Sequence, residues 1–263
     1  MRPIVALLTD FGVRDHYAGT MKGVVLSICP DATLVDISHE VPPHDVTTAA
    51  LELAASYKYF PAGTVFLIVV DPGVGSSRRP IAAEAGDYRF VAPDNGVLSA
   101  VFKESSPRRV VELTERRFAR PTVSHTFEGR DRFAPAAAWL AKGTDLRALG
   151  RSLTDFVRLD IPDADLSDDR VCGEVLRIDR FGNAITNIDR RMFDRLGRAG
   201  EKLEVQAGDH LVARLVTTYA EIAPAEVCGL FGSSDRLEIA ANSASAAGML
   251  GLTRGTKVTV RRL

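Results

Sequence analysis

Acidic residues follow directly after several short apolar runs, where they could bind a ligand or accept a proton. They are Asp10 after the run 4–8, Asp71 after the run 65–70 and Asp94 after the run 89–92. If these runs are strands of one open α/β sheet, the acids lie at the edge where such sheets bind ligands. Asp10, in Thr-Asp-Phe-Gly, is then placed to accept hydrogen bonds from vicinal hydroxyls such as those of a ribose. A turn aspartate that caps the next helix is the competing interpretation.

The loop after Asp71 contains glycines and paired arginines. Residues 71–79 read Asp-Pro-Gly-Val-Gly-Ser-Ser-Arg-Arg, and the glycine spacing fits neither a dinucleotide fingerprint nor a Walker A loop. Asp71 and Arg78 could form a positioned ion pair at the floor of a pocket, or they could belong to a plain Asp-Pro-Gly turn with solvated arginines. Asp94, Asn95 and Gly96 likewise offer either an acid and an amide for a ligand or a simple turn.

A second concentration of charge lies in residues 124–135, which read Ser-His-Thr-Phe-Glu-Gly-Arg-Asp-Arg-Phe-Ala-Pro. An imidazole, two carboxylates and two guanidiniums precede an alanine-rich helix around Trp139, where most of that charge must be paired. The structural alternative is a capping network with Asp131 near the helix dipole.

Residues 179–187 read Asp-Arg-Phe-Gly-Asn-Ala-Ile-Thr-Asn and could hold an amine and a flat heterocycle. The amide of Asn183 could read the edge of a base while the ring of Phe181 packs on its face, with Asp179 available to an amine. Tyr219 and Ser233 could complete such a pocket. A plain Gly-Asn turn is the alternative.

No metal site is predicted. The separated residues without metal-ligand spacing are His39, His44 and His210, and the cysteines without a CxxC pair are Cys29, Cys172 and Cys228. Neither a zinc site nor a disulfide framework is therefore expected, and a reducing, cytoplasmic compartment fits best.

The composition is that of a globular protein. The chain has 263 residues, 46% of them hydrophobic, and 33 Lys and Arg against 34 Asp and Glu give a formal net charge of −1. This length supports a sizeable core, and the composition excludes a disordered chain. The neutral balance removes the simplest electrostatic argument for nucleic acid. No stretch approaches the roughly 20 apolar residues that span a bilayer, and the first apolar run is too short for a signal peptide.

Apolar runs and helical periods alternate through about residue 160, which predicts an α/β domain around a mostly parallel sheet. The expected strands are 4–8, 33–37, 65–70 and 89–92. Met21 to Ile28 and Ala50 to Tyr57 have the spacing of buried helix faces.

After residue 160 the apolar runs become short and are separated by Gly, Asp and Asn. We therefore expect domains at 1–160 and 171–263. The acidic, proline-containing residues 161–170 are interpreted as a linker. The later short runs predict a smaller antiparallel β-barrel domain, with strands expected at 171–178, 202–206, 211–216, 237–240 and 257–261.

Together and in order, five motifs resemble the S-adenosyl-L-methionine hydroxide adenosyltransferase family, relatives of the fluorinase and chlorinase. They are Thr-Asp-Phe-Gly, Asp-Pro-Gly-Val-Gly with its Arg, Ala-Pro-Asp-Asn-Gly, Thr-Phe-x-Gly-Arg-Asp-x-Phe-Ala-Pro and Asp-Arg-Phe-Gly-Asn-x-x-Thr-Asn. The resemblance covers about residues 4–262. It implies an N-terminal α/β domain, a C-terminal β-barrel, and a homotrimer that holds substrate between the N-terminal domain of one subunit and the C-terminal domain of its neighbour.

The resemblance also implies roles for individual residues. Asp71 and Arg78 would belong to a water-activating triad, and Asp10 would hold the ribose hydroxyls. At the adenine, Asn183 would read the edge and Phe181 and Tyr219 would line the faces. Asp179 and Ser233 would contact the methionine end, for which Tyr17, in the loop after the first strand, is a further candidate. The remaining residues expected to line the substrate site are Asp94, Asn95 and Gly129.

The chain departs from the family pattern at Glu128, where hydrolytic members commonly carry His. Glu128 is a candidate for the third triad position, with its role open, because an ionised Glu accepts hydrogen bonds and cannot donate them. His125 cannot replace that side chain if the segment is extended, since residues three apart then face opposite sides. Gly129 in place of a halide-binding serine, and Val74 in place of a threonine, argue against fluoride chemistry. The carboxylate of Asp71 argues against chloride.

The reaction implied is attack of water or hydroxide on the ribose 5′-carbon of S-adenosylmethionine, without a metal or cofactor, to release adenosine and L-methionine. Other hypotheses are a non-catalytic sensor of S-adenosylmethionine or adenosine, a chlorinase-like enzyme, and a metal-dependent hydrolase that uses the scattered carboxylates.

Overall fold

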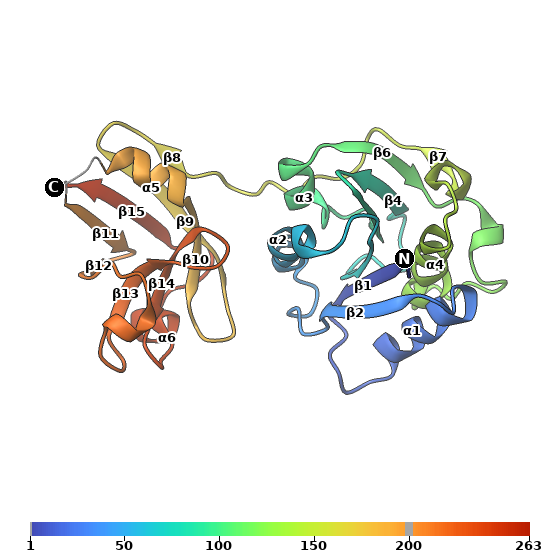
Figure 1. The fold of residues 1–263 in the computed structure, drawn as a ribbon, viewed down its shortest axis with the longest axis horizontal. Helices are drawn as coiled ribbons and strands as arrows, with labels where there is room; N and C mark the ends of the chain where they lie inside the picture. Colours follow the sequence, from blue (N-terminus) through green and yellow to red (C-terminus); the bar gives the residue numbers. More distant parts are fainter. Residues whose placement is uncertain (1, 198–201) are drawn as a thin grey trace. The chain divides into compact units, whose positions relative to one another are not determined.

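A computed structural model describes residues 2–197 and 202–263, which form two compact units that divide between Ile161 and Pro162 (Figure 1). In the part of the chain so described, no helix is both long and apolar enough to cross a membrane.

The first unit is built on a seven-stranded sheet with the order β2-β1-β3-β5-β4-β6-β7. Its strands are β1 Ile4–Thr9, β2 Thr33–Ser38, β3 Val65–Val69, β4 Pro80–Ala85, β5 Tyr88–Pro93, β6 Pro107–Glu112 and β7 Arg151–Ser152. The strands from β2 to β5 in this order pair in parallel, and the remaining pairings are antiparallel. The predicted α/β class is confirmed, with a mixed sheet whose parallel part contains every strand predicted for this unit.

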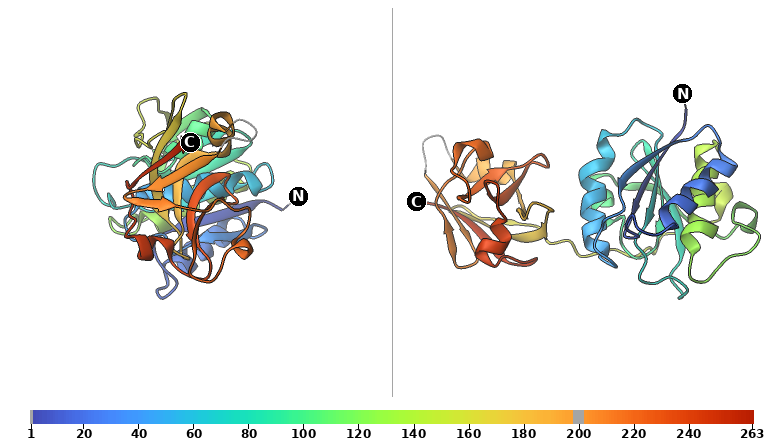
Figure 2. Two further views of the ribbon diagram at one scale, coloured as in Figure 1. Left: turned by 90° about the vertical axis from the view of Figure 1, so that its left-hand side faces the viewer. Right: turned by 90° about the horizontal axis from the view of Figure 1, so that it is seen from below.

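Helices cover both faces of this sheet, which explains the uninterrupted apolar run of β1. They are α1 Tyr17–Ile28, α2 Val46–Ser56, α3 Ser99–Glu104 and α4 Ala134–Ala141. Val5 and Leu7 pack in the core on the α1 and α4 side, whereas Ala6 and Leu8 pack in the core on the α2 and α3 side. Successive strand residues face opposite sides, so a strand covered on both faces is apolar throughout. The right-hand view of Figure 2 shows the light-blue α2 opposite the darker blue α1 and yellow-green α4.

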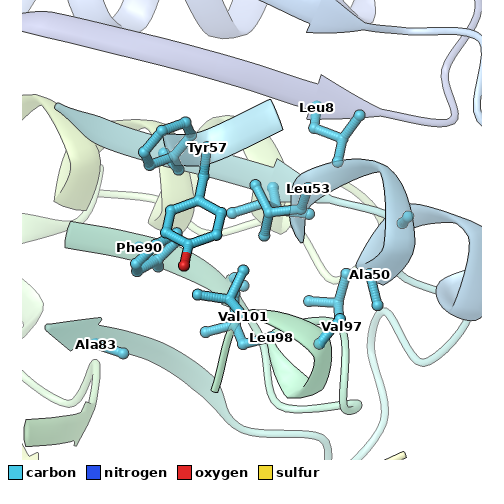
Figure 3. Packing of buried hydrophobic residues seen from close by; sticks show 14 of the residues in the cluster. Leu8, Ala50, Leu53, Tyr57, Ala83, Phe90, Val97, Leu98 and Val101 are labelled. Atoms are coloured by element: carbon cyan, nitrogen blue, oxygen red, sulfur yellow. The ribbon is translucent and has the colours of Figure 1, made fainter. Parts of the chain in front are cut away.

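Large aromatic and aliphatic side chains fill the core beneath α2 and α3 (Figure 3). Leu53 of α2 is fully buried, and so is Phe90 of β5, whose ring stacks on that of Phe66 at 5.2 Å between centroids. Asp45 caps the start of α2 by accepting a hydrogen bond from the backbone N–H of Thr48. This packing fixes the strands whose ends carry the predicted acidic residues.

The second unit is an antiparallel sheet that nearly closes on itself, as predicted for a barrel. Its elements are β8 Asp165–Leu166, β9 Arg170–Ile178, β10 Ala184–Asp189, α5 Arg190–Leu196, β11 Leu203–Ala207, β12 His210–Val212, β13 Val227–Phe231, β14 Arg236–Ala241, α6 Ala246–Leu250 and β15 Lys257–Arg262. The strands follow the order β12-β11-β15-β9-β10-β14-β13. The segment after β12 closes the ring, because Val216 N–H donates to Gly229 O at 3.0 Å and Gly229 N–H donates to Arg214 O at 2.8 Å.

Part of the acidic segment expected to be a linker is a strand of the second unit. Asp165 pairs with Cys172 and Leu166 with Val171, so β8 forms an edge strand beside β9. Edge strands tolerate charge because one side of their backbone has no partner strand. The acidic composition of residues 161–170 therefore did not exclude strand structure.

Candidate active site

The acidic residues that follow the parallel strands lie at one edge of the first sheet. Strand β3 is flanked by β1 and β5, and the three run in parallel. Thr9, which precedes Asp10, is in register with Val69, two residues before Asp71. The topology therefore brings the carboxyl ends of these strands together, at the edge where open α/β sheets bind ligands.

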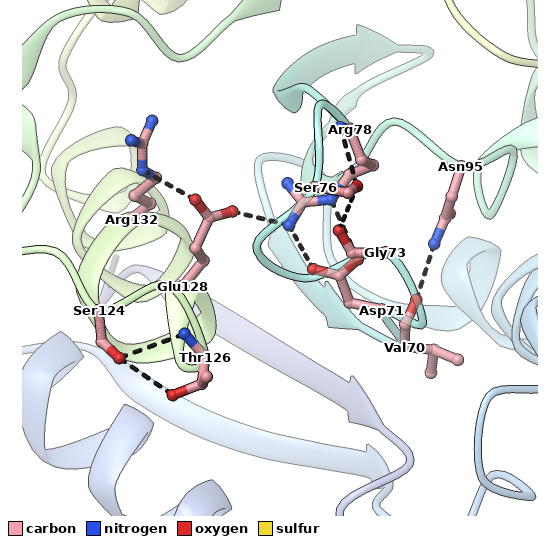
Figure 4. A network of polar contacts seen from close by, with 10 residues as sticks. All are labelled: Val70, Asp71, Gly73, Ser76, Arg78, Asn95, Ser124, Thr126, Glu128 and Arg132. Carbon is pink, nitrogen blue, oxygen red and sulfur yellow. Dashed lines mark hydrogen bonds and ion pairs between the residues drawn. The ribbon is translucent and has the colours of Figure 1, made fainter.

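Asp71, Arg78 and Glu128 form a buried ionic cluster at this edge (Figure 4). Arg78 donates from Nε to Asp71 Oδ1 at 3.0 Å and from Nη2 to Asp71 Oδ2. The same Nη2 donates to Glu128 Oε2 at 2.7 Å. The side chains of Asp71 and Arg78 are each 6% exposed and that of Glu128 is 13% exposed. The arginine is thus held by a bidentate contact on one side and by a second carboxylate on the other.

The loop between Asp71 and Arg78 folds back on itself to make this contact. Ser76 N–H donates to Gly73 O at 3.1 Å, and the Ser76 hydroxyl accepts from Arg78 N–H at 3.2 Å. Gly75 has a φ of +78°, and a Cβ there would lie 2.6 Å from the carbonyl oxygen of His125. Glycine therefore lets the loop approach the segment that carries Glu128.

Glu128 precedes a π-helical turn, Gly129–Phe133, that leads directly into α4. The segment is therefore not extended, and His125 lies in a turn with its side chain exposed. Gly129 is buried, and a Cβ on it would lie 3.1 Å from Met21 Sδ. Asp131 is fully buried and accepts hydrogen bonds from Arg130 at 2.7 Å, so this second acid of the segment is paired away from the cluster.

Burial raises the pKa of the Asp71 carboxyl above its ordinary value, Arg78 opposes the rise, and the neighbouring Glu128 adds to it. Burial and the second anion therefore make Asp71 a stronger base than a free aspartate, despite its contact with the cation of Arg78. This cluster is the part of the predicted site with the groups needed to orient water and accept a proton.

Asp10 directly follows β1, and Tyr17 begins α1. Asp10 Oδ2 accepts a hydrogen bond from the backbone N–H of His44 at 2.8 Å. Tyr17, expected in a loop, is the first residue of α1, and its ring packs 5.7 Å from that of Phe11 and 5.2 Å from that of Phe127. Tyr17 is therefore connected through Phe127 to the segment that carries Glu128.

Asp94 and Asn95 are bonded within the first unit. Asp94 accepts from Arg79 Nε at 2.8 Å and from the backbone N–H of Val157 at 2.8 Å, and its side chain is 2% exposed. Asn95 donates from Nδ2 to Val70 O at 2.9 Å, immediately before Asp71. Both residues thus hold the sheet edge together, and their predicted contact with substrate stays a prediction.

In the second unit, Asp179, Asn183 and Tyr219 gather at one place. Asp179 accepts from the backbone N–H groups of Phe181 and Asn183, both at 2.9 Å, and from Asn183 Nδ2 at 3.0 Å. The Tyr219 hydroxyl lies 3.5 Å from that amide nitrogen. The ring of Phe181 is 76% exposed, while Asn183 is buried. Ser233 is exposed, and no contact ties it to this group.

Sequence reasoning missed two charged residues that contact these groups. Glu238 of β14 is 6% exposed, and the Tyr219 hydroxyl lies 3.5 Å from its Oε2. Burial, followed by the charge of Asp179, raises the pKa of Glu238. Arg132 lies 3.2 Å from Glu128 in the first unit. Two signals in the sequence were available. Glu238 is a lone carboxylate within an apolar run, and Glu128 and Arg132 are four residues apart at the start of a helix.

Among residues 2–197 and 202–263, no cluster of three or more His, Cys, Asp and Glu side chains could hold a metal ion. The carboxylates of Asp71 and Glu128 both face the guanidinium of Arg78. A metal therefore has no prepared ligand set among the described residues.

Comparison with known proteins gives consistent results. Family models described as the SAM hydroxide adenosyltransferase N-terminal and C-terminal domains match residues 5–150 and 173–259. The chain is 38% identical over 261 residues to the (R)-S-adenosyl-L-methionine hydrolase of Salinispora tropica, covering 98% of this chain and 97% of that protein. It is 32% identical over 291 residues to the fluorinase of Nocardia brasiliensis, covering 99% and 97%. The crystal structure of an uncharacterized conserved protein from Thermotoga maritima superposes with a TM-score of 0.91 at 36% identity, covering 98% and 100%.

Proposed function

The chain belongs to the SAM hydroxide adenosyltransferase family, and we propose that it hydrolyses S-adenosyl-L-methionine to adenosine and L-methionine. The observation that carries this proposal is the Asp71, Arg78 and Glu128 cluster at the carboxyl edge of the first sheet. It offers a carboxylate base and a fixed guanidinium beside Asp10, which follows the neighbouring strand.

The chemistry of the substrate limits what the protein must supply. The leaving group is a neutral thioether that departs from a sulfonium, so no acid is needed to protonate it. Alignment of the attacking oxygen with the ribose 5′-carbon can contribute several kcal/mol by making the attack effectively intramolecular. The enzyme is then left with the task of activating the nucleophile.

Asp71 cannot fully deprotonate water before attack. Water has a pKa of about 15.7 and an ordinary aspartate one of about 3.9. Burial raises the pKa of Asp71, which narrows this gap without closing it. Proton transfer to Asp71 therefore accompanies or follows C–O bond formation, while Arg78 orients the water or stabilises the developing hydroxide. Glu128 holds Arg78 from the other side and fills the third position of the triad.

The remaining residues recognise the substrate in this proposal. Asp10 accepts hydrogen bonds from the ribose hydroxyls with its remaining lone pairs, and Asn183 hydrogen-bonds to the edge of adenine. The residues assigned to the faces of adenine are Phe181 and Tyr219, and those assigned to the methionine end are Tyr17, Asp179 and Ser233. An aromatic ring as exposed as that of Phe181 supports a stacking role.

We extend the proposal to the assembly and its setting. The substrate-binding residues are divided between the two units, so a homotrimer in which a neighbouring subunit supplies the second unit would complete each site. Free thiols at Cys29, Cys172 and Cys228 support a reducing, cytoplasmic setting. No metal or cofactor takes part in the proposed reaction.

One assay tests these statements. Purified protein is incubated with S-adenosylmethionine, with and without EDTA, and adenosine is followed by chromatography, with Asp71→Asn as the inactive control. We expect adenosine release that EDTA does not change. Binding without product would indicate a sensor, and EDTA-sensitive turnover would indicate a metal enzyme. Formation of 5′-chloro-5′-deoxyadenosine in high chloride would identify a halide-using enzyme. Each of these three results contradicts the proposed metal-independent hydrolysis.

A further inference from the structure

Two charged side chains occupy the open positions of the motif Thr-Phe-x-Gly-Arg-Asp-x-Phe-Ala-Pro. They are Glu128 and Arg132, and Arg132 Nε lies 3.2 Å from Glu128 Oε1. The buried Nε has no hydrogen-bond partner within residues 2–197 and 202–263, so this ion pair is its direct electrostatic contact. The two residues are four apart across the π-helical turn, a spacing at which side chains meet on one helix face.

The pair extends the cluster into an alternating chain of charges. Figure 4 shows Asp71, Arg78, Glu128 and Arg132 in sequence, each contacting the next. Glu128 Oε2 accepts from Arg78 and Glu128 Oε1 faces Arg132, so both carboxylate oxygens have a cation. The formal charge of the four residues is zero. Without Arg132 it would be −1, with two carboxylates around the single guanidinium of Arg78.

The other charged residues of this region are directed elsewhere. Asp71 is faced by Arg78 and Glu128, and Glu128 by Arg78 and Arg132. Arg120 and Arg130 both pair with the fully buried Asp131. Arg132 is therefore the cation, besides Arg78, whose contact determines where the carboxylate of Glu128 lies.

We propose that Arg132 is a positioning residue for the hydrolysis: it holds Glu128 against Arg78, so that Arg78 and Asp71 keep the geometry that orients the attacking water. The inference rests on the proposed function. It also gives Glu128 a definite role, as the bridge between two arginines and not as a proton donor.

The test compares Arg132→Gln, Glu128→Gln and the double variant with the unmodified protein. Arg132→Gln should lower kcat about fivefold with KM for S-adenosylmethionine unchanged, and Arg132→Lys should restore most of the loss. The double variant should be no slower than Glu128→Gln alone, since Arg132 acts through Glu128. Arg117→Gln is the matched control, because Arg117 is 68% exposed and pairs with Glu115 at 3.9 Å.

The pH profile distinguishes positioning from a merely structural role. Turnover requires ionised Asp71, so the acid limb of the kcat profile follows its pKa. Glu128→Gln removes an anion that raises this pKa and should move the limb to lower pH. Arg132→Gln takes from Glu128 one of its two cations, so that the uncompensated anion of Glu128 should move the limb to higher pH. Shifts in the same direction, or an additive double variant, would overturn the inference.

A second measurement keeps the inference testable if the protein does not hydrolyse S-adenosylmethionine. The carboxyl ¹³C resonance of Asp71 reports its titration without turnover, and the two single variants should shift its midpoint in opposite directions. Unmodified protein that releases no adenosine would refute the proposed function alone. An unchanged Asp71 titration in both variants would refute the role of Arg132 alone.

Discussion

Removal of the Arg78 guanidinium should separate catalysis from binding. In Arg78→Ala, the carboxylates of Asp71 and Glu128 lose the cation that contacts both of them. The side chains of Asp71 and Glu128 are only 6% and 13% exposed, so water cannot fully replace this cation. Loss of one partner from a buried ion pair costs about 3 to 5 kcal/mol, because an uncompensated charge stays behind. We expect a loss of this size in the stability of the first unit at pH 8. Turnover of the folded fraction should fall about a hundredfold to a thousandfold, as when a positioned donor is removed from an active site.

The loss of stability should depend on pH with a definite sign. Without Arg78, the largest influence that lowers the pKa of Asp71 is gone, and burial raises that pKa further above its unfolded value. A carboxyl with a raised folded-state pKa favours the folded state below the unfolded pKa, and this contribution is lost as pH rises through the folded pKa. Arg78→Ala should therefore be nearly as stable as the unmodified protein near pH 4 and increasingly less stable toward pH 8.

The assay uses the single tryptophan of the chain, Trp139, which lies in α4 of the first unit. Urea unfolding followed by its fluorescence at several pH values gives the stability, and adenosine release with isothermal titration gives kcat and the affinity for S-adenosylmethionine. Arg79→Ala is the matched control: it breaks the contact with Asp94 and should lower stability without slowing the folded enzyme. If Arg78→Ala proves too unstable, Arg78→Ala with Glu128→Gln should recover part of the stability. A pH-independent loss, or a fall in affinity as large as the fall in kcat, would refute the reasoning.

Three further substitutions test other parts of the proposal. Phe181→Ala should leave stability within about 0.5 kcal/mol because the ring is 76% exposed, yet raise KM about tenfold in adenosine-release kinetics if the ring stacks on adenine. Burial raises the pKa of Glu238 in the folded state, so ionisation of this carboxyl lowers the stability as pH rises above the ordinary pKa of Glu. Glu238→Gln should therefore flatten the fall in stability between pH 5 and pH 8, measured by urea unfolding followed by circular dichroism. Gly129→Ala should lower stability by about 1 to 3 kcal/mol in tryptophan-monitored unfolding, since its Cβ would meet Met21 Sδ at 3.1 Å, and unchanged stability would show that the site can relax.

The parallel half of the first sheet was predictable because its strands are buried on both faces. Runs such as 65–70 are apolar at every position, and the structure has β3 at Val65–Val69. Strand β4, which reads Pro-Ile-Ala-Ala-Glu-Ala, was missed because alanine has low strand propensity and carries no period. It pairs with β5, which follows after the two-residue turn Gly86-Asp87, and with β6, which lies farther along the chain. The alanine-rich run itself shows no alternation from which these pairings could be read.

The site was predictable only where its contacts join residues that are close in sequence. Asp71 and Arg78 lie in one short loop, so their pairing was readable from local sequence, and the bidentate contact between them agrees with it. Glu128 contacts Arg132, four residues away, but its other partner, Arg78, is fifty positions away in the chain. The π-helical turn that orients the Glu128 side chain has no sequence signature. Contacts between distant segments depend on the fold, and a motif reports only which residues are available for them.

Asp10, Asp71 and Asp94 follow equivalent strands, but their surroundings give them different chemistry. Both carboxylate oxygens of Asp94 accept hydrogen bonds, one from Arg79 and one from the backbone N–H of Val157, and the side chain is buried. Asp94 can therefore stabilise the sheet edge but has little free hydrogen-bonding capacity for a ligand. One oxygen of Asp10 accepts a backbone hydrogen bond, which leaves lone pairs for hydroxyl groups. For Asp71, burial and a neighbouring anion raise the pKa although an arginine contacts both oxygens. The same residue type at the same place in the fold is therefore suited to three different roles: Asp94 to holding the sheet edge together, Asp10 to accepting hydrogen bonds from a ligand, and Asp71 to accepting a proton in the proposed hydrolysis. Among these three acids, only Asp71 combines a raised pKa with a fixed cation that can orient water.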